Sequence, residues 1–157
     1  MWKSRYLWLT LSALAWAQPW RLTTQVVRVI DGDTVVVRLS DGDQTVRLDS
    51  IDAPERKQPG GEESRRALAG YLPAGGSVKI TRLGRDRYGR ILGQLYRPDG
   101  ANVNSLLVRN GQAWVYTKYC RDFSYWTPLQ MRARQQRLGV WAAPDPVPPW
   151  KFRHPPR

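Results

Sequence analysis

Short segments rich in valine and isoleucine constrain the fold of this chain more than any other feature of its sequence. They recur between residues 25 and 96 in windows of five or six residues, which is the usual length of a β-strand. Two successive windows flank Asp41-Gly42, a turn pair that favours a tight hairpin. The strands predicted in this way are 25–30, 34–39, 44–48, 77–82 and 91–96.

Two segments with apolar residues at helical spacing accompany these strands. Residues 62–72 carry apolar side chains on one face, and Pro73 stops the segment. Residues 102–110 repeat the helical spacing, and Gly111 stands where a C-terminal cap belongs. The sequence therefore predicts a helix in each segment, one of them inserted before the last two strands.

A capping motif predicts a third helix. Thr127 is placed as the N-cap, Pro128 occupies the first helical position, and Gln130 completes a capping box. This helix is expected to end at Gly139. Together the elements favour an α+β, mainly β, fold: a small five-stranded barrel of the oligonucleotide-binding (OB) type with three helices.

The two ends of the chain differ in composition from this domain, which is taken as residues 18–143. Residues 1–17 combine a short basic stretch, an apolar run too short to cross a bilayer comfortably, and two small residues, Ala15 and Ala17, that flank Trp16. A signal peptide cut after Ala17 is predicted, with a secreted or periplasmic product; an uncleaved anchor or a buried helix is the alternative. Residues 144–157 are Pro-rich and are expected to form an extended tail, pinned by Trp150.

The composition of the chain limits both the class of binding partner and the residue types available for catalysis. The chain has 25 Lys and Arg against 13 Asp and Glu, a net charge of +12, which favours polyanions such as nucleic acids. An ordinary soluble basic protein and one that adsorbs to anionic membranes remain alternatives. With Cys120 and His154 as its only cysteine and histidine, the chain supports neither an internal disulfide nor the usual zinc sites. Catalysis would depend on carboxylates, arginines and a hard metal ion.

Acidic residues gather where strand ends and turns are expected. Asp33 and Asp52 lie at strand edges, so adjacent strands would bring both to one spot, and Asp31 would add to the negative field. Ca²⁺ collects oxygen ligands of this kind at about 2.3–2.6 Å. A proline stiffens the turn before Glu55 and helps to aim that side chain. Asp-Gly-Asp is also ordinary turn composition, and the same triplet at 41–43 is interpreted only as a hairpin.

Two arginines accompany these carboxylates in strand positions. Arg47 lies within a strand, and Arg90 opens another strand after a Tyr-Gly turn. A phosphodiester gains negative charge on its equatorial oxygens during hydrolysis, and guanidinium groups match those oxygens bidentately without losing their proton. Fixed donors of this kind lower the barrier. Taken singly, each arginine could equally be a solvated surface charge.

In their order along the chain and in their residue identities, these segments resemble motifs of the staphylococcal nuclease (thermonuclease) family. The resemblance runs roughly from residue 26 to residue 141. Its motifs are Ile30-Asp31-Gly32-Asp33-Thr34, Arg47-Leu48, Ile51-Asp52-Ala53-Pro54-Glu55, Asp86-Arg87-Tyr88-Gly89-Arg90, Val103-Asn104, Leu107-Val108-Arg109-Asn110-Gly111 and Gly139-Val140-Trp141.

The resemblance implies a five-stranded OB barrel with three helices and a nuclease that cuts the 5′ P–O bond of DNA and RNA, leaving 3′-phosphates. It implies one Ca²⁺ acting as Lewis acid and template. The ligands would be Asp33, Asp52 and the backbone carbonyl of Ala53, with Asp31 close by. Glu55 would orient or deprotonate water, and Arg47 and Arg90 would hold the phosphate. Substrate contacts are expected at Arg87, Tyr88 and Tyr119.

The chain departs from the family pattern at a few positions. Ala53 stands where the better-known members have threonine, a change that a backbone ligand tolerates. Asp49 and Ser50 replace apolar residues, which is expected to add a negative charge near the site. The loop 56–61 is short and lacks the family's lysines, and Thr117 takes the place of a second tyrosine.

These observations leave two other functions to be weighed. A non-catalytic OB module could bind single strands through its charge and aromatic residues, and a basic extracellular adhesin could bind polyanions. Neither has a chemical need for the set of carboxylates and arginines. The expected protein is a monomeric, sequence-nonspecific nuclease acting on DNA and RNA, with single strands favoured, and without stable membrane association once the signal is removed.

Overall fold

The computed structural model describes residues 21–155, so the predicted signal peptide lies outside the described residues. The strands are β1 (Arg21–Asp31), β2 (Thr34–Leu39), β3 (Gly42–Leu48), β4 (Ile51–Asp52), β5 (Ser77–Arg85), β6 (Ile91–Tyr96) and β7 (Trp114–Val115). The helices are α1 (Gly61–Tyr71), α2 (Val103–Arg109), α3 (Phe123–Gln135), the 3₁₀ helix η1 (Gly139–Ala142) and α4 (Pro149–Arg153). Within residues 21–155, no helix has the length and apolarity needed to span a membrane.

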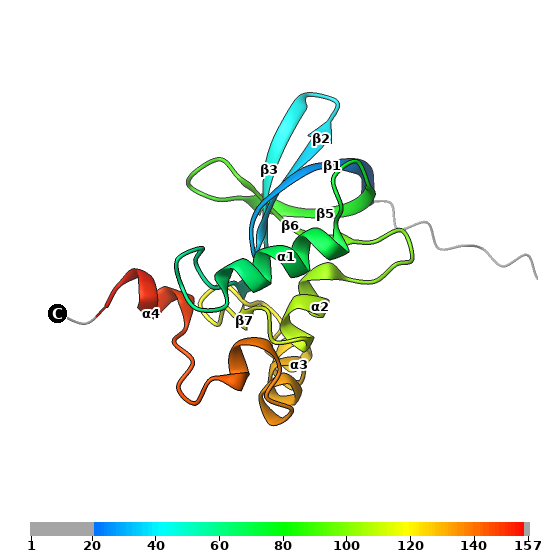
Figure 1. Cartoon of the computed structure of the whole chain (residues 1–157). Helices are drawn as coiled ribbons and strands as arrows, with labels where there is room; N and C mark the ends of the chain where they lie inside the picture. Colours follow the sequence, from blue (N-terminus) through cyan, green and yellow to red (C-terminus); the bar gives the residue numbers. More distant parts are fainter. Residues whose placement is uncertain (1–20, 156–157) are drawn as a thin grey trace, which may run out of the picture.

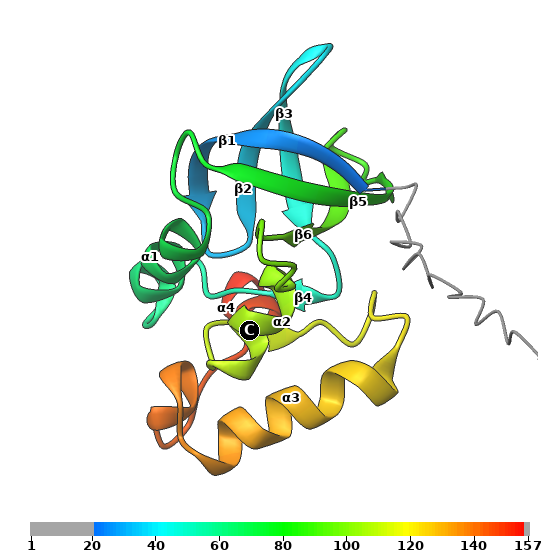
Figure 2. The same ribbon diagram turned by 90° about the vertical axis from the view of Figure 1, so that its right-hand side faces the viewer.

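The long strands form a closed barrel in the order β1-β2-β3-β6-β5, with β1 also paired to β5. Neighbours are antiparallel except β3 and β6, which run parallel with Val46 beside Ile91. Figures 1 and 2 show the barrel on one side of the molecule and the helices on the other. Val35, Val37, Val46 and Ile80 fill its interior and are fully buried. The predicted five-stranded OB barrel is confirmed.

A second, two-stranded sheet lies outside the barrel and was not predicted. Its strands β4 and β7 are antiparallel, with Ile51 opposite Val115 and Asp52 opposite Trp114. Each strand has only two residues, too few to show a period in the sequence. This small sheet fixes the backbone of Asp52 relative to the segment that follows α2.

The first two helices agree with the predicted segments to within one residue at each end. Helix α2 begins where the Asn102 side chain accepts a hydrogen bond from the Ser105 amide at 3.0 Å. Helix α1 begins after Gly60, whose φ of 87° is left-handed. At Gly61 a Cβ would stand 2.0 Å from the Glu55 carbonyl oxygen. Glycine at this position therefore lets the loop 55–61 fold tightly beside the barrel.

The third helix begins earlier than predicted. The Asp122 side chain, not Thr127, caps it by accepting a hydrogen bond from the Tyr125 amide at 3.1 Å. Pro128 lies inside the helix and leaves the carbonyl of the exposed Ser124 without its helical donor. The helix also ends before Gly139, at Gln135. The predicted capping box at Thr127 is wrong.

The Pro-rich end of the chain is ordered against the domain rather than extended throughout. It contains α4, whose first residue, Pro149, is buried. Trp150 stacks on Tyr116, with ring centroids 5.4 Å apart and 17° between the planes. Pinning by Trp150 is confirmed, whereas the absence of regular structure is wrong, because proline at the first helical position fits an α-helix.

Candidate active site

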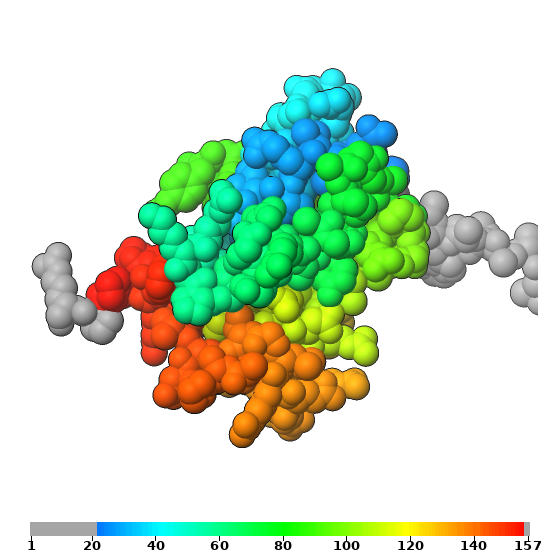
Figure 3. All heavy atoms as spheres, viewed as in Figure 1, coloured from blue at the N-terminus to red at the C-terminus, as the bar shows by residue number. Residues whose placement is uncertain are grey.

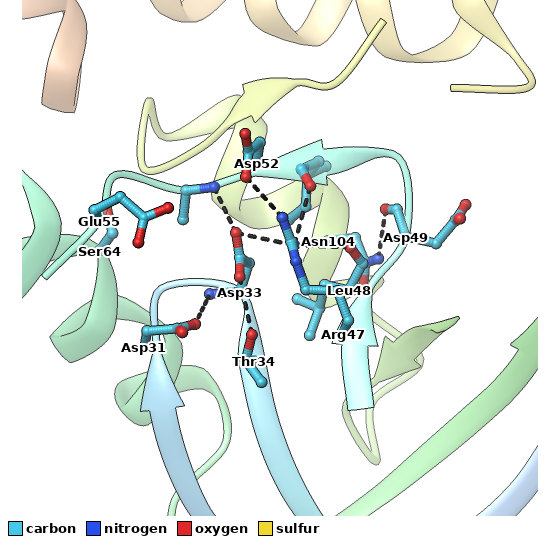
Figure 4. A network of polar contacts seen from close by, with 12 residues as sticks. Asp31, Asp33, Thr34, Arg47, Leu48, Asp49, Asp52, Glu55, Ser64 and Asn104 are labelled. Atoms are coloured by element: carbon cyan, nitrogen blue, oxygen red, sulfur yellow. Dashed lines mark hydrogen bonds and ion pairs between the residues drawn. The ribbon is translucent and has the colours of Figure 1, made fainter. Parts of the chain in front are cut away.

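Asp33, Arg47 and Asp52 meet at one end of the barrel (Figure 4). Asp33 lies in the turn between β1 and β2, Arg47 lies near the end of β3, and Asp52 comes from β4. The Nη1 atom of Arg47 is 2.9 Å from Asp33 Oδ2, and its Nη2 atom is 2.7 Å from Asp52 Oδ1. The two aspartates are buried, and their carboxylates thus share one guanidinium. Their predicted convergence agrees with this geometry.

Backbone hydrogen bonds hold the Asp33 turn in place. The amide of Ala53 donates to Asp33 Oδ2 at 2.6 Å, and the amide of Asp33 donates to Asp31 Oδ1 at 3.1 Å. At Gly32 a Cβ would stand 2.7 Å from the Cβ atoms of both Ala53 and Ser64. Only glycine therefore lets this turn approach the segment that carries Asp52, and the predicted proximity of Asp31 to the site holds.

The similar triplet at 41–43 differs in its surroundings. Gly42 has a φ of 109°, and an added Cβ there would meet nothing within 4 Å. Asp43 pairs with the exposed Arg38 on the surface of the hairpin. The interpretation of this triplet as a hairpin turn is confirmed.

Burial controls the charge of Asp33. It raises the pKa of this side chain to about 7; the charge of Arg47 opposes the rise, the charges of Asp31 and Asp52 add to it, and the hydrogen bond from the Ala53 amide opposes it. Ionisation of such a carboxylate costs free energy when no further positive charge lies beside it. A cation held beside it would favour the ionised form.

The oxygen atoms of Asp33 and Asp52 are suitable ligands for a hard cation that needs only a few protein carboxylates. Among residues 21–155, no three His, Cys, Asp or Glu side chains group closely enough to hold a metal ion by themselves. Asp33 and Asp52 nevertheless both contact the Arg47 guanidinium, so they are close enough to bind one cation together. Ca²⁺ completes its coordination with backbone carbonyls and water. The predicted ligands therefore suit calcium better than metals that need several imidazole or thiolate groups.

Glu55 follows this site after a short turn. Its amide donates to the Gln58 side chain at 3.1 Å, and its carbonyl accepts from the Gln58 amide at 2.8 Å. Figure 4 shows its carboxylate on the side of the site that carries Asp33. The side chain is 41% exposed. Its backbone is therefore held in place, and its carboxylate is partly exposed, with one oxygen 2.6 Å from the Arg153 guanidinium.

Arg90 belongs to a second group on the connection between β5 and β6. Its Nε atom is 2.7 Å from Asp86 Oδ2, and the amides of Arg90 and Tyr88 donate to Asp86 Oδ1 at 3.0 and 2.9 Å. Burial raises the pKa of Asp86, but these three hydrogen bonds outweigh it and lower the pKa below its ordinary value. Asp86 is thus the residue that orients Arg90, a role that the sequence analysis missed.

The second group stands apart from the carboxylates. Within the described chain, Arg90 forms no hydrogen bond or ion pair with Asp33, Asp52 or Glu55. It precedes β6, which runs parallel to β3, the strand of Arg47. Arg47 therefore lies on β3 and Arg90 lies just before the neighbouring strand β6, and a bound phosphate would have to join them.

The remaining substrate-binding candidates are exposed. Tyr88 is 67% exposed, and the Arg87 guanidinium lies 4.8 Å from the centre of its ring. Tyr119 is 57% exposed and makes an edge contact with Tyr116 in the segment after β7. Exposed rings of this kind can stack on bases, and their roles stay predictions.

Comparison with known proteins places this site in a family. A family model described as staphylococcal nuclease homologue matches residues 45–143. The chain belongs to the staphylococcal nuclease family. It is 52% identical over 130 residues to an uncharacterized endonuclease of Escherichia coli, covering 83% of this chain and 84% of the relative. It is 39% identical over 158 residues to a micrococcal nuclease of Shigella flexneri, covering 92% and 86%.

A more distant relative shares part of its length. Over 110 residues the chain is 36% identical to the staphylococcal-like nuclease CAN1 of Arabidopsis thaliana, covering 69% of this chain and 32% of that protein. Nuclease activity on nucleic acid follows from membership of the staphylococcal nuclease family.

The departure from the family pattern at Asp49 places a buried carboxylate in the turn between β3 and β4. Figure 4 shows its side chain turned away from Asp33. The carboxylate is buried and accepts a hydrogen bond from Ser50 Oγ at 2.7 Å, and Ser50 adopts a left-handed φ of 65°. The charges that act on Asp33 are those of Arg47, Asp31 and Asp52. The effect of Asp49 on the metal ligands stays a prediction.

Asn104, on α2, holds backbone segments near the site in place through its buried side chain. Its side chain accepts from the Leu95 amide at 3.1 Å and donates to the carbonyls of Asp49 and Gly93 at 3.1 and 3.2 Å. It is fully buried. A polar residue on the apolar face of α2 is the sequence signal for such a clamp, which joins the turn before β4 to β6.

Arg153 is the further residue that sequence reasoning missed. It is the last residue of α4, and its guanidinium contacts both Asp52 and Glu55. No local pattern marks it, because it lies among prolines about 100 residues from its partners. Only the course of the folded chain brings it to the staphylococcal nuclease site.

Proposed function

We propose that this nuclease hydrolyses the phosphodiester bonds of DNA and RNA with one Ca²⁺ ion, without regard to base sequence, and leaves 3′-phosphate ends. One observation carries the proposal: two buried carboxylates, Asp33 and Asp52, share a guanidinium beside a partly exposed third carboxylate, Glu55. A binding module has no use for buried acids that face a polyanion, because they repel the phosphates that it must hold.

Asp33 and Asp52 would hold the cation with the backbone carbonyl of Ala53, and Asp31 would support the turn through the Asp33 amide. When bound, the ion supplies a Lewis acid for a phosphate oxygen. Glu55 would accept a proton from, or orient, the attacking water. Its exposure and its tight backbone suit that task, because a general base must reach solvent and still hold its position.

Arg47 and Arg90 would stabilise the additional negative charge of the five-coordinate phosphorus. Arg47 is fixed by the two carboxylates, and Arg90 is fixed by Asp86. Both guanidiniums are therefore oriented before substrate arrives, which is the condition under which donors lower a barrier most. Arg47 from β3 and Arg90 from the connection before β6 would bind the phosphate from two directions.

Substrate selection would rest on charge and stacking. A net charge of +12 attracts the backbone of any nucleic acid. The exposed rings of Tyr88 and Tyr119 would stack on unpaired bases of any kind, which favours single strands. We further propose that the protein is a monomer. Because residues 1–17 resemble a signal peptide, we also propose that it is secreted or periplasmic.

The experiment is a cleavage assay with matched substrates. The protein is incubated with single-stranded DNA, single-stranded RNA and duplex DNA, in Ca²⁺ or in excess chelator, and the product ends are analysed. The proposal predicts Ca²⁺-dependent cleavage of all three, fastest on single strands, with 3′-phosphate ends. Full activity in chelator would remove the metal assignment. Tight binding without cleavage would mean that the barrel acts as a binding module.

A further inference from the structure

A guanidinium from the C-terminal helix lies on the acidic side chains that the proposed chemistry requires. The Nη2 atom of Arg153 is 2.8 Å from Asp52 Oδ2, and its Nη1 atom is 3.2 Å from Asp52 Oδ1 and 2.6 Å from Glu55 Oε1. Asp52 Oδ1 also accepts from Arg47 at 2.7 Å. Both oxygens of this ligand are therefore engaged by arginines, and the base is engaged with them.

Arg153 reaches this position on a docked segment. The Gln58 side chain, which is buried, donates to the Val147 carbonyl at 2.6 Å. Trp150 stacks on Tyr116 and packs against the small second core around Trp114. Figure 3 shows this segment lying against the loop that leads into α1. These contacts hold Arg153 at a high effective concentration next to Asp52.

We propose that Arg153 competes with the catalytic cation for Asp52 and blocks Glu55, so that α4 must leave the site before the enzyme can act. The inference rests on the proposed calcium site. Arg47 contacts Asp52 only through Oδ1, whereas Arg153 also occupies Oδ2. A cation bound at Oδ2 would lie at contact distance from this second guanidinium, and Coulomb repulsion makes the two occupants exclude one another. In the docked state Glu55 also has an oxygen engaged by Arg153 rather than available to water.

The competition has a measurable size. When only a fraction of the molecules is competent to bind, the apparent dissociation constant rises by the inverse of that fraction. If the docked state holds about 90–99% of the molecules, removal of Arg153 should strengthen cation binding by about 10- to 100-fold. The same relation requires the cation to shift α4 toward the released state, because coupling between two occupants is reciprocal.

The test compares Arg153→Gln with Lys151→Gln by calorimetric titration of Ca²⁺ in the absence of nucleic acid. Lys151 is exposed on the same helix, so its variant removes one positive charge without touching the site. Arg153→Gln should bind Ca²⁺ at least about 10-fold more tightly than wild type, and Lys151→Gln should stay near wild type. Hydrogen exchange supplies a second measurement: Ca²⁺ should accelerate exchange of the α4 amides in wild type.

Three outcomes would overturn the inference. Equal Ca²⁺ affinities for Arg153→Gln and wild type, with unchanged exchange in α4, would remove the competition and leave the proposed function intact. A higher KM for single-stranded DNA at unchanged Ca²⁺ affinity would assign Arg153 to substrate binding instead. Absence of Ca²⁺ binding in both proteins would overturn the metal assignment, and the inference with it.

Discussion

Replacement of Arg47 by alanine tests whether the two buried carboxylates depend on a shared cation. The side chains of Arg47, Asp33 and Asp52 are 14%, 8% and 1% exposed, so water screens their attraction poorly. Nη1 also donates to the carbonyls of Leu48 and Ile51, at 3.2 and 3.1 Å. One substitution therefore removes two ion pairs and two hydrogen bonds at the centre of the site.

The expected loss of stability follows from these contacts. Removal of one partner from a buried ion pair costs about 3–5 kcal/mol, because an uncompensated charge stays behind. Asp52 keeps Arg153 as a partner, and Asp33 can take up a proton, so Arg47→Ala should lie in the lower half of that range. At a denaturant slope of about 2 kcal/mol per molar, the urea midpoint should fall by roughly 1.5–2 M.

The assay is urea unfolding in chelator, with Arg38→Ala as the control. Arg38 pairs with Asp43 on the same hairpin, but both side chains are largely solvent-exposed. Its variant should unfold near the wild-type midpoint, because exposed pairs contribute little. If Arg47→Ala shifted the midpoint no more than Arg38→Ala, the claim that Arg47 neutralises a buried acidic pair would be refuted.

Three further predictions concern the orienting residue, the buried clamp and the charge. Asp86→Asn should lower kcat by about 10- to 100-fold, because Arg90 would no longer be aligned with the phosphate. The folded pKa of Asp86 is lower than the unfolded value of 3.8, so its carboxylate stabilises the fold above pH 3.8, and this effect is lost as the pH falls through the folded pKa. The urea midpoints of variant and wild type should therefore converge in acid, and a constant gap would contradict this. Asn104→Ala removes three buried hydrogen bonds and should cost about 2–4 kcal/mol by calorimetry, whereas a loss near zero would exclude a clamp. Affinity for single-stranded DNA should fall steeply with salt in a titration, and a flat response would count against charge-driven binding.

Much of this fold could be predicted because the barrel strands carry their own signals. Valine-rich windows and the turn at Asp41-Gly42 are local, and closing them into a barrel follows from burying one face. The third helix shows the limit of local signals. Thr127, Pro128 and Gln130 form a good start motif, yet Asp122 begins the helix five residues earlier, because its side chain reaches the Tyr125 amide.

In the candidate site, too, some features follow from local sequence and others depend on distant contacts. Asp33 and Asp52 could be predicted to meet because each lies at a strand edge. The two Asp-Gly-Asp triplets, in contrast, differ only through distant neighbours: Gly32 is packed against Ala53, and Gly42 has nothing near it. The contacts of Arg153 depend on where the chain returns after η1, and no pattern within its own segment encodes that path.

The central claim is that Glu55 acts on water beside a Ca²⁺ held by Asp33 and Asp52. The most direct test is single-turnover cleavage of single-stranded DNA in saturating Ca²⁺ by Glu55→Gln, compared with Glu63→Gln, whose carboxylate is 59% exposed on α1. We expect a rate about 10²- to 10⁴-fold below wild type for Glu55→Gln, with DNA and Ca²⁺ still bound, and a near-normal rate for Glu63→Gln. A Glu55→Gln enzyme that cleaves at the wild-type rate would contradict the central claim.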